Sequence, residues 1–214
     1  MDKRTIFWDI DTQYDFIVPD GKLYARGAEE IIPVVSDLRA MAIDGGCSIV
    51  ASMDWHSPNN PEISDQPDFK ETFPPHCIAG TPGAQRVGYL GNLPIDVVEI
   101  EQQNPGELAE LVQKDQFHIA IHKEAISVFS NPNTVNLVES VSPGTIIAFG
   151  AVLEFCVQDT LRGLARFPGV QLVLVRDATV TLDPGVEARV YAELQRMGID
   201  VTEFSRLREM SLCG

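Results

Sequence analysis

The order of apolar and amphipathic segments is the feature that most constrains the fold of this chain. Short apolar runs typical of buried strands occupy residues 5–10, 48–53, 118–122, 145–149, 171–175 and 199–202. Helical spacing of apolar residues marks the segments 28–44, 154–167 and 184–197 between them. Strands that alternate with helices predict an α/β fold of three layers, with helices on both faces of a mainly parallel central sheet.

The chain of 214 residues is long enough for one sizeable core, so we predict a single domain over residues 1–214. One segment, from about residue 54 to about residue 104, departs from the alternating pattern because it is rich in Pro, Asn, Asp and Gly. Long segments without periodicity are usually functional in compact domains. We therefore expect a loop-rich excursion that covers the functional site.

Charge and hydropathy exclude several classes of partner. A net charge of −15 disfavours nucleic-acid binding, and no apolar stretch approaches the ~20 residues of a membrane span. The first residues lack the apolar run of a signal peptide, so we expect a cytoplasmic protein. In that compartment we expect free thiols at Cys47, Cys77, Cys156 and Cys213. The sequence leaves the oligomeric state open, including a homo-oligomer.

Chemically useful side chains follow four of the expected strands. Ligand crevices of parallel sheets lie at the carboxyl ends of the strands. Asp11 follows the first strand, Asp54 the second and Lys123 the third, and residues 150–155 lead from the next strand to Cys156. Two carboxylates, an ammonium and a thiol are therefore expected at one rim of the sheet, where the strands end.

Each of these residues also has an ordinary structural explanation. Cys156 begins an expected helix, where the free N–H groups lower a thiol pKa and accept an oxyanion, but buried cysteines are often only structural. Asp11 is a helix cap or a general base. Lys123 is a solvated lysine or a cation that stabilises the thiolate.

Asp54, His56 and His76 offer one carboxylate and two imidazoles from the irregular segment. Such a set leaves positions open for water or substrate, as catalytic metal sites require. The alternative is that the two histidines only make hydrogen bonds within loops.

Several segments between about Thr5 and Ala178 carry a family resemblance. They are DTQYDF at residues 11–16, DWH at 54–56, FPPHCIAGTPGA at 73–84, Lys123, GAVLEFCV at 150–157 and DA at 177–178. Together they resemble the nicotinamidase branch of the isochorismatase-like cysteine hydrolases. The resemblance implies a Rossmann-like or flavodoxin-like fold and hydrolysis of nicotinamide to nicotinate and ammonia, a step of NAD salvage.

The resemblance also implies a role for each reacting residue. Asp11 is then the base, Lys123 the orienting cation and Cys156 the nucleophile that forms a thioester. The backbone N–H groups of Val152 and Cys156 form the oxyanion hole. The bond between Ala151 and Val152 is the position of a cis peptide in the family.

A divalent metal ion and an aromatic substrate pocket are further implications of the resemblance. The implied metal ligands are Asp54, His56, Glu62 and His76. Zinc is the first choice, and iron or manganese also suits these ligands. Phe16 and Phe73 would sandwich the substrate ring, and Phe129 would close the pocket.

The sequence departs from the family pattern at Leu153, which replaces a threonine, at Phe73, which replaces a tryptophan, and at Glu62, which replaces a histidine. Another amide, such as an N-carbamoyl or ureido compound, is therefore an alternative substrate. Residues 9–12 (DIDT) also resemble the opening of haloacid-dehalogenase-like phosphatases, but the downstream acidic pair of that mechanism is missing. A non-catalytic binding module would lack a triad residue, and all three are present.

Overall fold

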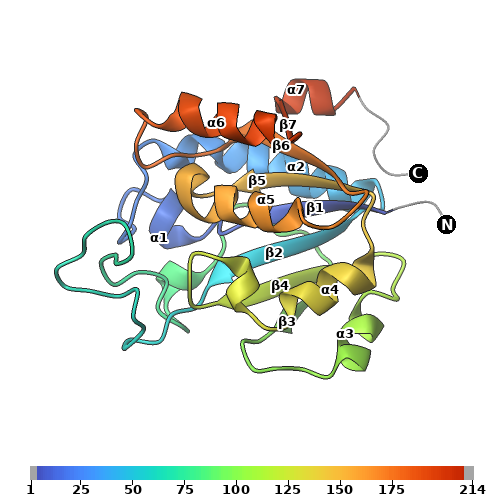
Figure 1. The fold of residues 1–214 in the computed structure, drawn as a ribbon, viewed down its shortest axis with the longest axis horizontal. Coiled ribbons are helices and arrows are strands. Elements are labelled where there is room, and N and C mark those ends of the chain that lie inside the picture. Colours follow the sequence, from blue (N-terminus) through green and yellow to red (C-terminus); the bar gives the residue numbers. More distant parts are fainter. Residues whose placement is uncertain (1–3, 210–214) are drawn as a thin grey trace.

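The computed structural model describes residues 4–209, and over this part of the chain the predicted three-layer α/β fold is confirmed (Figure 1). The central sheet has seven strands, every pair of neighbours is parallel, and the strand order is β3-β4-β2-β1-β5-β6-β7. The strands are β1 (Thr5–Ile10), β2 (Ser48–Asp54), β3 (Ile95–Val98), β4 (His118–Lys123), β5 (Thr145–Gly150), β6 (Gln171–Thr179) and β7 (Asp200–Thr202).

Helices cover both faces of the sheet (Figure 1). They are α1 (Tyr14–Ile17), α2 (Ile32–Asp44), α3 (Pro105–Leu111), α4 (Thr134–Val141), α5 (Gln158–Leu164), α6 (Glu187–Arg196) and α7 (Phe204–Leu207). Successive side chains of a strand point to opposite faces. Ile6 and Trp8 of β1 therefore join the core under α3, α4, α5 and α6, whereas Phe7 joins the core under α1, α2 and α7.

The structure bears on two expectations, one about membrane spans and one about the thiols. No described helix has both the length and the apolar character needed to cross a membrane. Cys77 and Cys156 are free thiols, as expected. The same expectation is wrong for Cys47, which is disulfide-bonded. Cys213 lies outside the described residues.

A polar cluster lies buried beneath the sheet rim and joins distant parts of the chain. Asp9 of β1 accepts hydrogen bonds from Arg39 of α2, at 2.7 Å, and from Arg86. Arg86 in turn lies 2.7 Å from Nε2 of His118 at the start of β4. Burial alone would raise the Asp9 pKa, but the two guanidinium groups hold it well below its ordinary value. The cluster thus fastens the long loop segment to the sheet at Arg86.

His118 makes the stability of this cluster depend on pH. Burial and the neighbouring Arg86 lower the pKa of His118 from 6.5 to about 4, so the folded chain keeps this imidazole neutral. Between pH 6.5 and pH 4 the unfolded chain therefore binds more protons at this residue. The free energy of unfolding must fall as the pH falls through that window, by on the order of 3 kcal/mol for this group.

A glutamine at position 118 tests this pH dependence, because its amide oxygen still accepts a hydrogen bond and does not titrate. We expect His118→Gln to lose less unfolding free energy than the parent chain between pH 7 and pH 4.5. Urea unfolding at both pH values measures the difference. An identical loss in the two proteins would contradict a neutral His118 in the fold.

Candidate active site

Four neighbouring strands bring the expected residues to one rim of the sheet. Asp54 and Lys123 end β2 and β4 and stand directly opposite each other in the strand pairing. Asp11 follows β1, which lies between β2 and β5. Cys156 lies in a short π-helix (Leu153–Val157) that follows β5. The parallel topology, rather than closeness in sequence, therefore assembles the site.

Gly150 allows the chain to leave β5 at this point. Its φ is +131°, and an added Cβ would lie 1.9 Å from the carbonyl oxygen of Ile10. A side chain here would push apart the ends of β1 and β5, which carry Asp11 and the segment leading to Cys156. The following Ala151–Val152 peptide bond is cis, at the position that the family resemblance implies.

The ammonium group of Lys123 is the centre of the assembled side chains. Its Nζ lies 3.0 Å from Oδ2 of Asp11, forms a second ion pair with Asp54 and lies 3.6 Å from Sγ of Cys156. The Lys123 side chain is fully buried. Burial alone would lower its pKa, but the carboxylates of Asp11 and Asp54 raise it well above the ordinary value. Lys123 is therefore a permanent cation.

Asp11 and Cys156 are placed for proton transfer. A carboxylate oxygen of Asp11 and Sγ of Cys156 lie within 4.8 Å of each other. Oδ1 of Asp11 accepts a 2.7 Å hydrogen bond from Ser52. Oδ2 lies close to Lys123 but accepts no well-directed hydrogen bond from the described residues, so it can receive a proton. Burial and Asp54 raise the Asp11 pKa against the opposing effect of Lys123, which makes the carboxylate a stronger base.

The expectation that the helix start lowers the thiol pKa of Cys156 is wrong. The residue is 6% exposed, and its burial raises the pKa well above the ordinary value. Lys123 acts against this effect, and the negative charges of Asp11 and Asp54 add to it. The resting group is a neutral thiol, so an attack by sulfur requires a base.

Gln13 fixes the backbone of Asp54 beside the triad. Its Nε2 donates to the carbonyl oxygens of Asp54, at 2.7 Å, and of Ala84, at 2.9 Å. Its Oε1 accepts the N–H of Asp54 at 2.8 Å. The fully buried glutamine therefore connects the ends of β1 and β2 with the long loop segment.

Asp54, His56 and His76 form a cluster that fits a divalent metal ion. Their ligand atoms all lie within 4.8 Å of one another, and Nε2 of each histidine lies 3.6 Å from Oδ2 of Asp54. His56 is fully buried, yet neither ring nitrogen has a hydrogen-bond partner among the described residues. Unpaired buried polar atoms are costly, and a bound ion would satisfy Nε2. The carboxylate and imidazole donors suit zinc, iron or manganese.

Glu62 lies near this cluster but is not one of its three members. It lines the same pocket as Asp54 and His76, and its Oε1 accepts the N–H of Ile126 at 2.8 Å. Its role as a fourth ligand stays a prediction.

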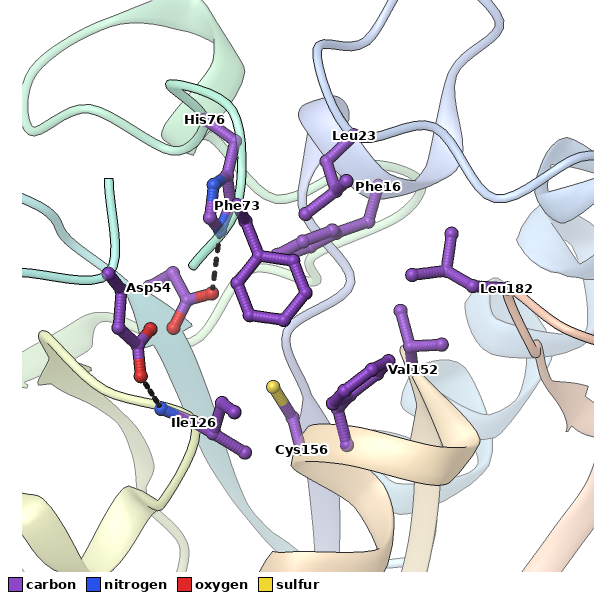
Figure 2. A pocket seen from close by; sticks show the side chains of 11 residues that line it. Phe16, Leu23, Asp54, Phe73, His76, Ile126, Val152, Cys156 and Leu182 are labelled. Atoms are coloured by element: carbon purple, nitrogen blue, oxygen red, sulfur yellow. Dashed lines mark hydrogen bonds and ion pairs between the residues drawn. The ribbon is translucent and has the colours of Figure 1, made fainter. Parts of the chain in front are cut away.

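A small pocket opens over the thiol of Cys156 (Figure 2). It holds about 300 Å³, a volume that includes space open to solvent. Most of its lining is apolar or aromatic, namely Phe16, Leu23, Phe73, Ile126, Val152, Phe155 and Leu182. Asp54, Glu62, His76 and Cys156 supply the polar groups. The pocket therefore suits a small aromatic ring with a few polar atoms.

Phe16 and Phe73 lie where the sequence predicts them, whereas Phe129 does not line this pocket. Its ring packs against Phe167, with centroids 6.2 Å apart, and fills the space beside Gly163 of α5, where a side chain would clash with it. A glycine in a helix leaves room for a neighbouring ring, which explains why Phe129 turns toward α5. The expectation that it closes the pocket is therefore not met.

The structure also brings in residues that sequence reasoning missed. Gln13 belongs to a quoted motif, and Phe155 precedes the predicted nucleophile, so both carried a readable signal. Ser52, Leu23 and Leu182 carried none. They reach the site only through the pairing of β1 with β2 and through loops that return to the rim.

Comparisons with known proteins show which proteins this chain is similar to. The nicotinamidase/pyrazinamidase of Mycobacterium tuberculosis is 37% identical over 75 residues, which cover 35% of this chain and 39% of that protein. The nicotinamidase of Saccharomyces cerevisiae is 25% identical over 217 aligned residues, covering 91% of this chain and 97% of that protein. The crystal structure of a pyrazinamidase of Pyrococcus horikoshii in complex with zinc is 25% identical, with a TM-score of 0.73, over 94% of this chain and 99% of that one.

The family-model comparison matches an isochorismatase domain to residues 99–205, which is half of the chain. This segment contains Lys123 and Cys156, while the structural likeness extends over nearly all of the chain. The chain belongs to the isochorismatase family.

Proposed function

We propose that this protein hydrolyses nicotinamide to nicotinate and ammonia through a thioester on Cys156. One observation carries the proposal: the carboxylate of Asp11 and the thiol of Cys156 meet around the buried ammonium of Lys123, beside a small aromatic pocket. The names of the relatives described above support nicotinamide as the amide. We propose the cytoplasm as the compartment because Cys156 needs a reduced thiol, although the disulfide at Cys47 is more typical of an oxidising compartment.

The first half of the reaction transfers the acyl group to sulfur. Asp11 takes the proton of the Cys156 thiol as sulfur attacks the carboxamide carbon, and the C=O bond opens to an oxyanion. The N–H of Val152 makes no hydrogen bond with another described residue, so it can donate to this oxyanion together with the N–H of Cys156. Asp11 then gives its proton to the nitrogen, the C–N bond breaks and ammonia leaves.

The second half releases the acid. Asp11 takes a proton from a water molecule, whose oxygen attacks the thioester carbon. The C–S bond then breaks, nicotinate leaves, and Cys156 recovers its proton. Lys123 keeps its charge throughout and stabilises the carboxylate of Asp11 and the developing thiolate.

The cluster of Asp54, His56 and His76 would hold the metal ion, with Glu62 as the proposed fourth ligand. When bound, a divalent ion supplies a Lewis acid that can bind the ring nitrogen of a pyridine. Phe16 and Phe73 would hold the ring from the apolar side of the pocket. A metal-ligand set of this kind favours a pyridine amide over a ureido compound.

Ammonia release tests the proposal directly. Purified protein should release ammonia from nicotinamide faster than from N-carbamoyl and ureido amides under the same conditions. Activity on ureido amides alone would support the alternative substrate class and contradict nicotinamide. Release of phosphate from a chromogenic ester would instead support a phosphatase.

We expect His56→Ala to lower the affinity for zinc by at least about tenfold, since loss of mere supporting partners of metal ligands already costs 10–100-fold. Elemental analysis after dialysis against limiting zinc measures the bound metal. His122→Ala is the matched control, because His122 is also nearly buried but pairs with Glu99 and stacks on Trp55. Equal metal content in the two variants would refute the ligand assignment.

A further inference from the structure

Leu182 lines both the small pocket over Cys156 and a larger outer groove. The groove holds about 1660 Å³, a volume that includes space open to solvent, and it shares four lining residues with the pocket: Leu23, Phe73, Phe155 and Leu182. In Figure 2 the side chain of Leu182 lies across the pocket from Asp54. Removing this side chain would join the two spaces on the side away from the metal cluster.

Leu182 belongs to an irregular segment after β6, and hydrogen bonds attach this segment to the nucleophile loop. Val180 accepts the N–H of Leu153 at 2.7 Å, and its own N–H donates to Gly150 at 3.2 Å. These two bonds hold the beginning of the segment. They leave the position of residues 181–183 to other contacts.

The carboxylate of Glu154 supplies those contacts. Its Oε1 accepts the N–H groups of Leu182, at 3.0 Å, and Asp183, at 2.8 Å. Its Oε2 accepts the hydroxyl of Thr181 at 2.9 Å. Hydrogen bonds to a charged acceptor are stronger than neutral ones. One side chain, two positions before the proposed nucleophile, thus holds three consecutive residues, of which Leu182 lines the pocket.

We propose that Glu154 is a positioning residue that holds Leu182 as the wall between the two spaces, and that this wall restricts the enzyme to small, single-ring amides. The inference rests on the proposed function, because it concerns the substrate range of the same site. Glu154 lines the outer groove and touches no reacting atom, so it acts through Leu182. A purely structural role for Glu154 would instead affect all substrates alike.

A panel of ring-methylated nicotinamides tests the wall. The ratio of kcat/KM for nicotinamide to kcat/KM for each methylated amide is measured in the parent chain, in Leu182→Ala and in Glu154→Ala. We expect both variants to lower this ratio by about tenfold for at least one methylated amide, because one methyl group in an apolar pocket is worth roughly 10–200-fold. Glu154→Gln should keep the parent ratio, because its amide oxygen still accepts both N–H groups.

Asp177→Ala is the matched control, since Asp177 also accepts a backbone N–H, from Phe204 at 2.8 Å, but lies outside the pocket. It should leave the ratios unchanged. An unchanged ratio in Leu182→Ala would overturn the wall. If kcat/KM in Glu154→Ala fell by the same factor for every amide, the positioning role would be overturned.

Hydrogen exchange tests the hold on residues 181–183 without any substrate. In Glu154→Ala the amides of Leu182 and Asp183 should exchange at least about tenfold faster than in the parent chain, and Glu154→Gln should protect them. Unchanged protection in Glu154→Ala would overturn the proposal even in an active enzyme. If the parent chain does not hydrolyse nicotinamide, the proposed function fails, while this measurement still decides whether Glu154 holds the wall.

Discussion

Cys156→Ala is expected to lower the turnover of nicotinamide by at least about 10⁴-fold and to leave the protein folded. In the proposed mechanism the sulfur forms the bond that carries the acyl group, and removal of a nucleophile from a coupled triad costs on the order of 10⁶ in kcat in a well-studied hydrolase. The side chain is small and lies beside two carboxylates, so its loss should cost little stability. Ammonia release and urea unfolding measure the two effects separately.

Two further variants make this test specific. Cys156→Ser keeps the size of the side chain but replaces the thiol by a poorer nucleophile, and it should also be inactive. Cys77→Ala removes the other free thiol of the described residues, whose Sγ faces the carbonyl oxygen of Gly83 rather than the triad. It should retain ammonia release. If ammonia release survived in Cys156→Ala and was lost in Cys77→Ala, the nucleophile would be Cys77 instead of Cys156.

The rim of the site could be predicted from sequence because its parts depend on local patterns and one topological rule. Apolar runs marked β1, β2, β4 and β5, and parallel strands place their carboxyl ends at one edge. Asp11, Asp54 and Lys123 follow or end such runs, so their convergence followed from strand ends alone.

Other elements were missed for identifiable reasons. β3 is an edge strand with Ile95 and Val97 partly exposed, and Asp96 between them breaks the apolar run. α3 carried a readable start, since Asn104 caps the N–H of Gly106 and Pro105 follows it, but its short length gives little periodicity. The segment after residue 153 was predicted as one helix, whereas it is a π-helix followed by α5.

The electrostatics of Cys156 could not be predicted from sequence. A helix start favours a thiolate, and that local rule gave the wrong direction for its pKa. The direction of the pKa shift depends on burial, on Lys123 from β4 and on two carboxylates that arrive from β1 and β2. The role of Glu154 was hidden for the same reason, because its partners at residues 181–183 come from a distant loop.

Lys123→Met is expected to lower the free energy of unfolding of the metal-free protein by about 3–5 kcal/mol at neutral pH, besides abolishing turnover. Methionine fills most of the volume of lysine but carries no charge. It would leave the buried carboxylates of Asp11 and Asp54 facing each other without the cation that now pairs with both. Urea unfolding after chelation of metal measures the loss.

A second substitution separates charge from packing in this result. In the double variant Lys123→Met with Asp54→Asn, one of the two carboxylates is neutral, so we expect much of the lost stability to return although a further native group has been removed. Lys114→Met is the surface control, because the Lys114–Asp96 pair is about half-exposed on the lysine side and such pairs contribute at most about 1 kcal/mol. Two results would contradict this role of Lys123: a loss of unfolding free energy in Lys123→Met no larger than that in Lys114→Met, or a further loss instead of a recovery when Asp54→Asn is added. Either result would mean that the ammonium of Lys123 does not offset the repulsion between the two buried carboxylates.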